Sequence, residues 1–175
     1  IGEARIKQGR KSCKSSFLIV DVQSAKNTDS ARGKGYDAGK KISGIKRHIA
    51  VDTQGLPHAF AVTAANVTDR NGALLAFEQN RTELDEVESI LCDGSYSGKP
   101  FANSVKALLG ERVTVQVVKC NELHTFAVIP KWWGVERSFA WLEKQRRLWK
   151  NCERTFSTAL QFIILTFVAL LLRRL

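Results

Sequence analysis

Two short apolar runs in this chain each end at an aspartate. Residues 17–20 (FLIV) precede Asp21, and residues 88–92 (ESILC) precede Asp93. Runs of four or five residues that are rich in apolar and β-branched types are typical of buried strands rather than of helices. These runs therefore predict a core built on a sheet, with a carboxylate at the end of two of its strands.

Between the two runs the sequence predicts a hairpin. Residues 46–52 (KRHIAVD) and 56–63 (LPHAFAVT) are β-type runs joined by a short turn that contains a glycine. Residues 113–118 (VTVQVV) predict a further strand, and residues 126–129 (FAVI) are a candidate for another. The Gly- and Lys-rich residues 30–43 are expected to form a loop.

Helical patterns separate and follow the later strands. We expect one helix from Thr68 and Asp69 to about residue 80, a second over residues 99–109, and a long one over residues 133–149. Residues 156–172 (FSTALQFIILTFVALLL) are nearly continuous apolar sequence, but they are short for a membrane span and include four polar residues. They predict a helix packed on the core, with a transmembrane helix as the alternative.

The order of these elements predicts an α/β fold. Early antiparallel strands followed by alternating strands and helices give a mixed sheet flanked by helices, in the order of the ribonuclease-H-like fold. Residues 1–16 are polar and basic and are expected to be an N-terminal tail or linker, and residues 17–175 are expected to form one domain.

In this fold the strands that end at Asp21 and Asp93 lie side by side. Glu136 falls in the first turn of the predicted helix 133–149, beside the apolar stripe that faces the core. Clustered carboxylates are the ligands that Mg²⁺ prefers, so these three acids predict a catalytic metal site. Asp52 and Asp69 are weaker candidates, since they suit a hairpin and a helix start. Glu143, two turns beyond Glu136, is the other candidate for the third acid.

The charge balance favours a polyanionic partner. Lys and Arg number 27 against 17 acidic residues, which gives a formal net charge of +10, although a solvated basic surface would give the same balance. Four scattered cysteines and three scattered histidines provide no zinc-site spacing. The candidate DNA contacts form a loop cluster and a helix flank: Lys40, Lys41, Lys46, Arg47, Arg137, Lys144, Arg146, Arg147 and Lys150.

At these residues the chain resembles a known family, the bacterial insertion-sequence transposases with a DDE triad, in the group typified by insertion sequences four and five. The similarity runs in order from about residue 5 to the end. The blocks that carry it are residues 21–28 (DVQSAKNT), 35–41 (GYDAGKK), 46–48 (KRH), 51–57 (VDTQGLP), 65–69 (ANVTD), 93–96 (DGSY), 133–142 (WGVERSFAWL), 146–148 (RRL) and 172–175 (LRRL).

The resemblance implies a transposase catalytic domain in which Asp21, Asp93 and Glu136 bind two Mg²⁺ ions, with Mn²⁺ as a substitute. It implies cleavage at the element's ends and strand transfer into target DNA, by a homodimer or larger assembly in the bacterial cytoplasm. The family's end-recognition segment is expected to be encoded upstream of this sequence. The first alternative is an inactive or partial form of such a transposase, either a DNA-binding relic or one product of a split reading frame. The second alternative is a nuclease of the same fold that cuts DNA without joining it.

Overall fold

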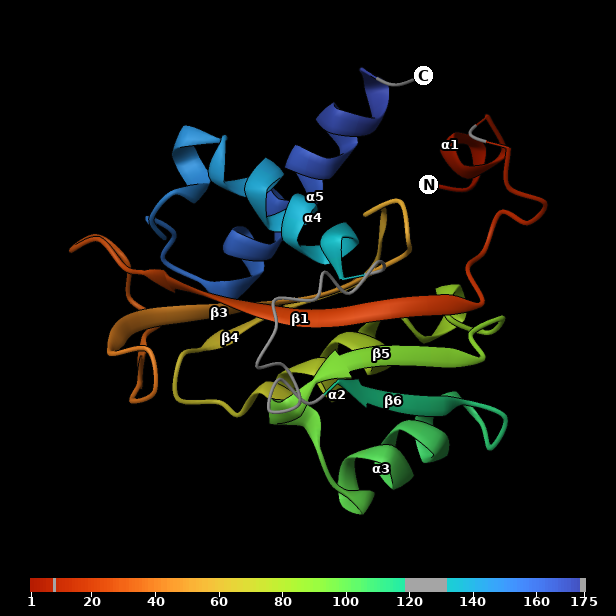
Figure 1. The fold of residues 1–175 in the computed structure, drawn as a ribbon. Coiled ribbons are helices and arrows are strands. Elements are labelled where there is room, and N and C mark those ends of the chain that lie inside the picture. Colours follow the sequence, from red (N-terminus) through yellow and green to blue (C-terminus); the bar gives the residue numbers. More distant parts are fainter. Residues whose placement is uncertain (8, 119–131, 174–175) are drawn as a thin grey trace, which may run out of the picture.

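The computed structural model describes residues 1–7, 9–118 and 132–173. Within them, six strands form one mixed sheet in the order β2-β3-β1-β5-β6, with β4 paired to β3 (Figure 1). β1 is antiparallel to β3 and parallel to β5, and β5 is parallel to β6. The strands are β1 (Phe17–Lys26), β2 (Gly35–Asp37), β3 (Ile42–Val51), β4 (Pro57–Ala64), β5 (Ser89–Asp93) and β6 (Thr114–Val118).

Helices cover both faces of this sheet, with α2 and α3 on one side and α4 and α5 on the other (Figure 1). Alternate residues of β1 divide between the two layers, because successive side chains of a strand point to opposite faces. Leu18 and Val20 belong to the core under α2 and α3, whereas Ile19 belongs to the core under α4 and α5. The helices are α1 (Gly2–Lys7), α2 (Asp69–Gln79), α3 (Lys99–Leu109), α4 (Trp133–Glu143) and α5 (Phe156–Leu172), with short 3₁₀ turns η1 (Arg81–Glu83), η2 (Gly94–Tyr96) and η4 (Arg146–Leu148).

This architecture confirms the expected fold class, a mixed α/β sheet flanked by helices and consistent with the ribonuclease-H-like fold. The hairpin is β3 and β4, and Gly55 in its turn has a φ of +75°, which glycine adopts without strain. The helix predicted from Thr68 begins there, since the Thr68 hydroxyl accepts a hydrogen bond from the Asn71 amide.

The apolar segment 156–172 is a helix on the core. Ala159, Ile163 and Phe167 of α5 are buried, and the Phe167 ring lies 5.6 Å from that of Phe60 on β4. In the part of the chain that the structure describes, no helix combines the length and apolarity needed to cross a bilayer.

Four expectations need correction. Residues 30–43, expected to form a loop, contain β2 and the start of β3, which pair with each other. Asp21 does not end its strand, because β1 continues to Lys26 through its pairing with β3. The long helix predicted to residue 149 ends at Glu143, since Gln145 takes an extended conformation with φ −88° and ψ 113°. The expected N-terminal tail contains the short helix α1, whose buried Arg5 pairs with Asp52 of the hairpin. The candidate strand over residues 126–129 lies outside the described residues.

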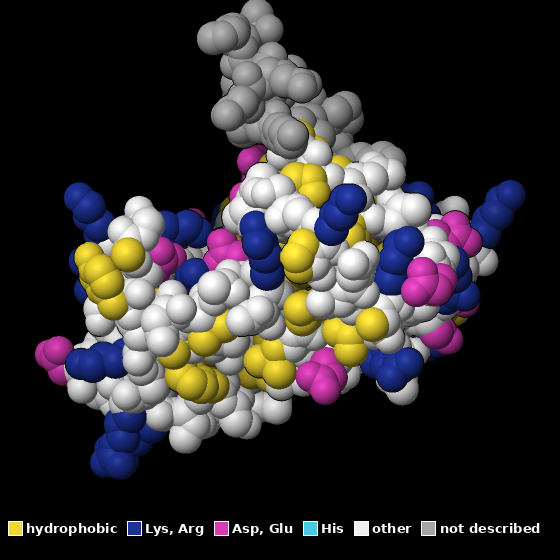
Figure 2. Space-filling view, turned by 90° about the horizontal axis from the view of Figure 1, so that it is seen from below, with side chains coloured by type: hydrophobic (Ala, Val, Ile, Leu, Met, Phe, Trp, Pro, Cys, Tyr) yellow, Lys and Arg dark blue, Asp and Glu magenta, His cyan; other side chains and the backbone are white. Residues whose placement is uncertain are grey.

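Figure 2 views the molecule from the side on which α3 lies in Figure 1. Lys and Arg side chains are spread singly over this side, and apolar side chains are exposed between them.

Candidate active site

Asp21 and Asp93 come from adjacent parallel strands at the same level. The last described pair between β1 and β5 is Ile19 with Leu91, and both side chains belong to the core under α4 and α5. Extending this register by two residues sets Asp21 opposite Asp93 on the same face of the sheet. Neighbouring strands lie about 4.8 Å apart, so the two carboxylates are brought together.

The carboxylate of Asp21 is poorly solvated. One of its oxygens accepts a hydrogen bond from the Val22 amide at 2.7 Å, and no described group donates to the other. Burial raises the pKa of Asp21 to about 6, and the nearby charge of Asp93 adds to this effect. The Val22 hydrogen bond and the charge of Lys40 act in the opposite direction, but they do not offset the loss of water.

Asp93 connects β5 to the turn that follows it. Its Oδ1 accepts hydrogen bonds from the Ser95 amide at 2.9 Å and from the Ser95 hydroxyl at 2.5 Å, which starts the 3₁₀ turn η2. No described group donates to its Oδ2. Asp21 and Asp93 therefore each keep one carboxylate oxygen available for a ligand.

Helix α4 runs along β1 above these two residues. Its N-terminal half packs on the β3–β4 turn, where the Ser138 hydroxyl donates to the Gly55 carbonyl at 2.8 Å. At its other end, Gln23 of β1 donates to the Glu143 carboxylate at 2.8 Å. Along β1, Asp21 therefore lies between the β3–β4 turn, which contacts the N-terminal half of α4, and Gln23, which contacts its C-terminal end.

The third acid is not fixed by these contacts. Glu136 is exposed in the first turn of α4 and has no described bond to Asp21 or Asp93, whereas Glu143 contacts β1 two residues beyond Asp21. Among the described residues no group of three His, Cys, Asp or Glu side chains is close enough to hold a metal ion. Asp21 and Asp93 lie on neighbouring strands, and no described contact joins Glu136 to either of them.

The two aspartates nevertheless fit a divalent cation. They offer hard oxygen donors at one point, and Asp21 is partly buried near a second negative charge without a described salt bridge. A bound cation would remove the electrostatic cost of this arrangement.

A comparison with protein families agrees with this arrangement. Residues 12–172 match the family described as the transposase DDE domain. The chain belongs to the transposase DDE domain family. A comparison with curated proteins found no match. Membership implies an enzyme of DNA transposition, and it implies that DNA is a partner of this chain.

The cations expected to contact DNA in this transposase domain differ in exposure. Arg47 is 2% exposed, and its guanidinium donates to the Leu148 carbonyl at 2.5 Å and to Gln23 at 3.1 Å. Lys46 is also buried and pairs with Asp69 at 2.7 Å. These two side chains therefore hold elements together inside the domain.

The remaining candidates lie on the surface or near it. Arg137 is partly buried, stacked over Trp133 at 3.8 Å from the ring centroid, and it donates to the Gln54 carbonyl. Arg147 pairs with Glu153 at 3.0 Å. The side chains exposed to solvent are Lys40, Lys41, Lys144, Arg146, Arg147 and Lys150.

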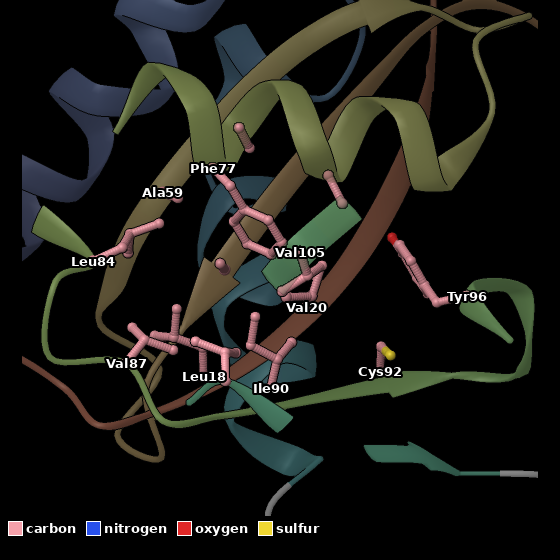
Figure 3. Close-up of a cluster of buried hydrophobic side chains, with 14 of the residues drawn as sticks. Leu18, Val20, Ala59, Phe77, Leu84, Val87, Ile90, Cys92, Tyr96 and Val105 are labelled. Atoms are coloured by element: carbon pink, nitrogen blue, oxygen red, sulfur yellow. The ribbon is translucent and has the colours of Figure 1, made fainter. Parts of the chain in front are cut away.

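Tyr96 was not anticipated from the sequence. It is fully buried, its hydroxyl has no described hydrogen-bond partner, and Figure 3 shows the side chain at the edge of the apolar cluster with that hydroxyl directed inward, toward α2. Burial raises its pKa, and the charges of Asp21, Asp69 and Asp93 add to this effect. In the sequence it appears only as the last residue of the block 93–96 (DGSY), to which no role beyond that of Asp93 was assigned.

Proposed function

We propose that this chain is the catalytic domain of an insertion-sequence transposase of the four/five-type group, which cuts the ends of its element and transfers them into target DNA. The observation that carries the proposal is the pairing of Asp21 and Asp93 on adjacent parallel strands, in a domain of the DDE family. Each keeps a carboxylate oxygen without a described donor, as a metal ligand would.

Asp21, Asp93 and Glu136 would hold two Mg²⁺ ions, with Mn²⁺ as a substitute. When bound, such ions activate the attacking oxygen and stabilise the leaving oxygen of a phosphoryl transfer. For this role Asp21 must be ionised, although burial favours its protonated form. We therefore expect metal binding and proton release from Asp21 to be coupled.

The exposed cations support a DNA path across one end of the sheet. Lys40 and Lys41 lie in the turn before β3, and Lys144, Arg146 and Lys150 follow α4. Both segments adjoin the carboxyl-terminal part of β1: Lys40 donates to the Val22 carbonyl at 3.3 Å, and Asn151 donates to the Lys26 carbonyl at 2.8 Å. A phosphate backbone crossing this end would approach Asp21.

Further parts of the proposal concern the assembly. Two element ends must be held together, so we propose that the chain acts as a homodimer or larger assembly on DNA. We propose that this assembly acts in the bacterial cytoplasm.

The test is nicking of supercoiled plasmid carrying the element's ends, with Mg²⁺ or Mn²⁺. We expect Asp21→Asn and Asp93→Asn to abolish nicking while leaving the circular dichroism spectrum unchanged. Glu136→Gln and Glu143→Gln form a matched pair on the same helix, and we expect only the first to abolish nicking. Loss with Glu143→Gln alone would move the third acid to that position.

A joining assay then separates a transposase from a nuclease. A labelled oligonucleotide with a 3′-OH end should become linked to the plasmid.

Retained nicking in Asp93→Asn would overturn the proposed site. Nicking without linked product would support a hydrolytic nuclease instead. An unaltered chain that binds DNA but does not nick, even when supplied with an upstream end-recognition segment, would support a relic.

A further inference from the structure

Arg5 is a buried cation in the N-terminal segment before β1. It is 7% exposed, and the helix α1 that carries it lies on the side of the sheet that holds α4 and α5 (Figure 1). Its Nη1 pairs with the carboxylate of Asp52, which follows β3. Its Nη2 donates to the Lys14 carbonyl at 3.1 Å, and its Nε donates to the Ser12 carbonyl at 3.3 Å. One guanidinium therefore gathers the N-terminal segment around itself and ties it to the end of β3.

Asp52 uses its two carboxylate oxygens for different purposes. It is 1% exposed, and its Oδ1 closes the β3–β4 turn by accepting from the amides of Gln54 at 2.8 Å and Leu56 at 3.0 Å. Its Oδ2 pairs with Arg5, while the His58 Nε2 lies 3.5 Å away and makes no described hydrogen bond. A buried carboxylate that loses its cation must regain water or take up a proton. The conformation of this turn therefore depends on Arg5.

The same turn seats the N-terminal half of α4. The Ser138 hydroxyl donates to the Gly55 carbonyl at 2.8 Å. The two backbones also approach closely, since a Cβ atom added to Gly134 would lie 3.1 Å from the Asp52 carbonyl oxygen. Both contacts fall within two residues of Glu136 along α4. A displacement of the turn would therefore be passed to the part of the helix that carries this acid.

We propose that Arg5 is a positioning residue for Glu136, because it holds the β3–β4 turn against α4 through Asp52. Glu136 is exposed and has no described contact with Asp21 or Asp93, so its distance from them is set by how α4 is seated. A misplacement of about 1 Å by a residue far from the chemistry can lower a rate about 100-fold. The inference rests on the proposed function, since it takes Glu136 as the third acid.

The N-terminal segment has a second anchor that does not involve the turn. Lys14 pairs with Asp85 at 2.7 Å and donates to the Thr82 carbonyl at 3.0 Å. The Ser12 hydroxyl donates to Glu86 at 2.7 Å. These partners lie between α2 and β5. Lys14→Ala therefore removes an anchor of the same segment and keeps the carbonyl that Arg5 uses, which makes it the matched control.

Hydrogen exchange of the metal-free chain tests the coupling without cleavage. We expect the amides of residues 52–56 and 133–139 to exchange on the order of 10-fold faster in Arg5→Ala, but at nearly unaltered rates in Lys14→Ala. Arg5→Lys should lie closer to the unaltered chain, because it keeps a positive charge opposite Asp52. The amides of α3, on the other face of the sheet, report any loss of global stability.

A second variant carries the test if Arg5→Ala does not fold. Asp52→Asn breaks the ion pair without leaving a charge on the buried side chain, and its oxygen can still accept from the turn amides. We expect it to speed exchange of residues 133–139 as well.

Nicking of supercoiled plasmid then measures the catalytic consequence. Initial rates would be compared over a range of Mg²⁺ concentrations, below the melting temperature of every variant. We expect Arg5→Ala to lower the maximal rate about 10- to 100-fold and to raise the Mg²⁺ concentration that gives half of it. Lys14→Ala should match the unaltered chain in both quantities.

The opposite outcomes are distinguishable. Unchanged exchange in α4 of Arg5→Ala would overturn the inference. Equal acceleration in α3 and α4, or equal loss of nicking in Arg5→Ala and Lys14→Ala, would overturn it by making Arg5 a general structural residue. Faster exchange in α4 with an unchanged nicking rate would overturn the link to Glu136 and leave the proposed function intact. Faster exchange in α4 of a chain that never nicks would support the coupling and count against the proposed function.

Discussion

The fold partly desolvates the carboxylate of Asp21, and no described salt bridge compensates for the lost hydration. Asp93 adds a second negative charge from the neighbouring strand, and the Val22 amide is the one described donor. The metal-free protein is therefore expected to carry an electrostatic strain at this residue, which a bound cation relieves. This is a stability cost located at the residues on which the proposed activity depends.

The pH dependence of stability tests this account. The pKa of Asp21 is raised from 3.8 to about 6 in the folded chain, so the stability linked to it is present below pH 4 and is lost as the pH rises through about 6. We expect Asp21→Asn to stabilise the metal-free protein at pH 7 by on the order of 2–3 kcal/mol, with the difference vanishing near pH 4. Urea unfolding at both pH values measures it, with the exposed Asp29→Asn as control. Equal stability of Asp21→Asn and the unaltered chain at pH 7 would contradict the burial of this charge.

At the scale of elements, the approach of α2 to the sheet depends on one glycine. A Cβ atom at Gly72 would lie 2.0 Å from the ring of His48, which projects from β3 and is 1% exposed. That imidazole bonds to the Thr63 hydroxyl at 2.9 Å, and burial lowers its pKa to about 4. The ring is therefore a neutral packing group, and it cannot move aside easily.

We therefore expect Gly72→Ala to lower the free energy of unfolding, although alanine has a higher helix propensity than glycine. In an exposed helix the change stabilises by about 0.5–1 kcal/mol, but here we expect a loss of about 1–3 kcal/mol from overpacking. Urea unfolding measures the effect. In a double-mutant cycle, His48→Ala should remove most of the penalty of Gly72→Ala. A stabilising Gly72→Ala would show that α2 shifts freely on the sheet.

At the scale of the whole molecule, the formal charge of +10 is distributed between two roles. Arg5, Lys46 and Arg47 are buried and hold the N-terminal segment, α2 and the segment after α4 on the sheet. Lys41, Lys144 and Lys150 are exposed, so their ammonium groups are accessible to a polyanion. Net charge alone does not separate these roles, because burial is decided by the fold.

The salt dependence of duplex binding separates them. Each of Lys41→Ala, Lys144→Ala and Lys150→Ala should weaken DNA binding uniformly across sequences and lower the slope of log K against log salt by about one. Arg47→Ala should instead lower the melting temperature, since it leaves the Leu148 carbonyl and Gln23 without their donor. Unchanged slopes in all three lysine variants would remove these lysines from the DNA path.

The sequence by itself determined most of the elements. The β3–β4 hairpin, the start of α2 at Thr68, the helix over Lys99–Leu109 and the apolar helix over Phe156–Leu172 all lie where the local pattern indicated. Each depends on interactions between residues close in sequence, such as a cap, a glycine turn or an apolar period. The two strands that carry Asp21 and Asp93 were predicted for the same reason.

Only the tertiary structure decided how those elements meet. β1 continues beyond Asp21 because it pairs with β3. Arg47 can be buried because its guanidinium donates to the carbonyl of Leu148, about a hundred positions away in sequence. The contact of Glu143 with Gln23 likewise depends on a partner distant in the chain, and Tyr96 is buried only because elements distant in the chain pack around it. Such long-range contacts leave no local periodicity, because their geometry exists only once the sheet and its two helical layers have packed together.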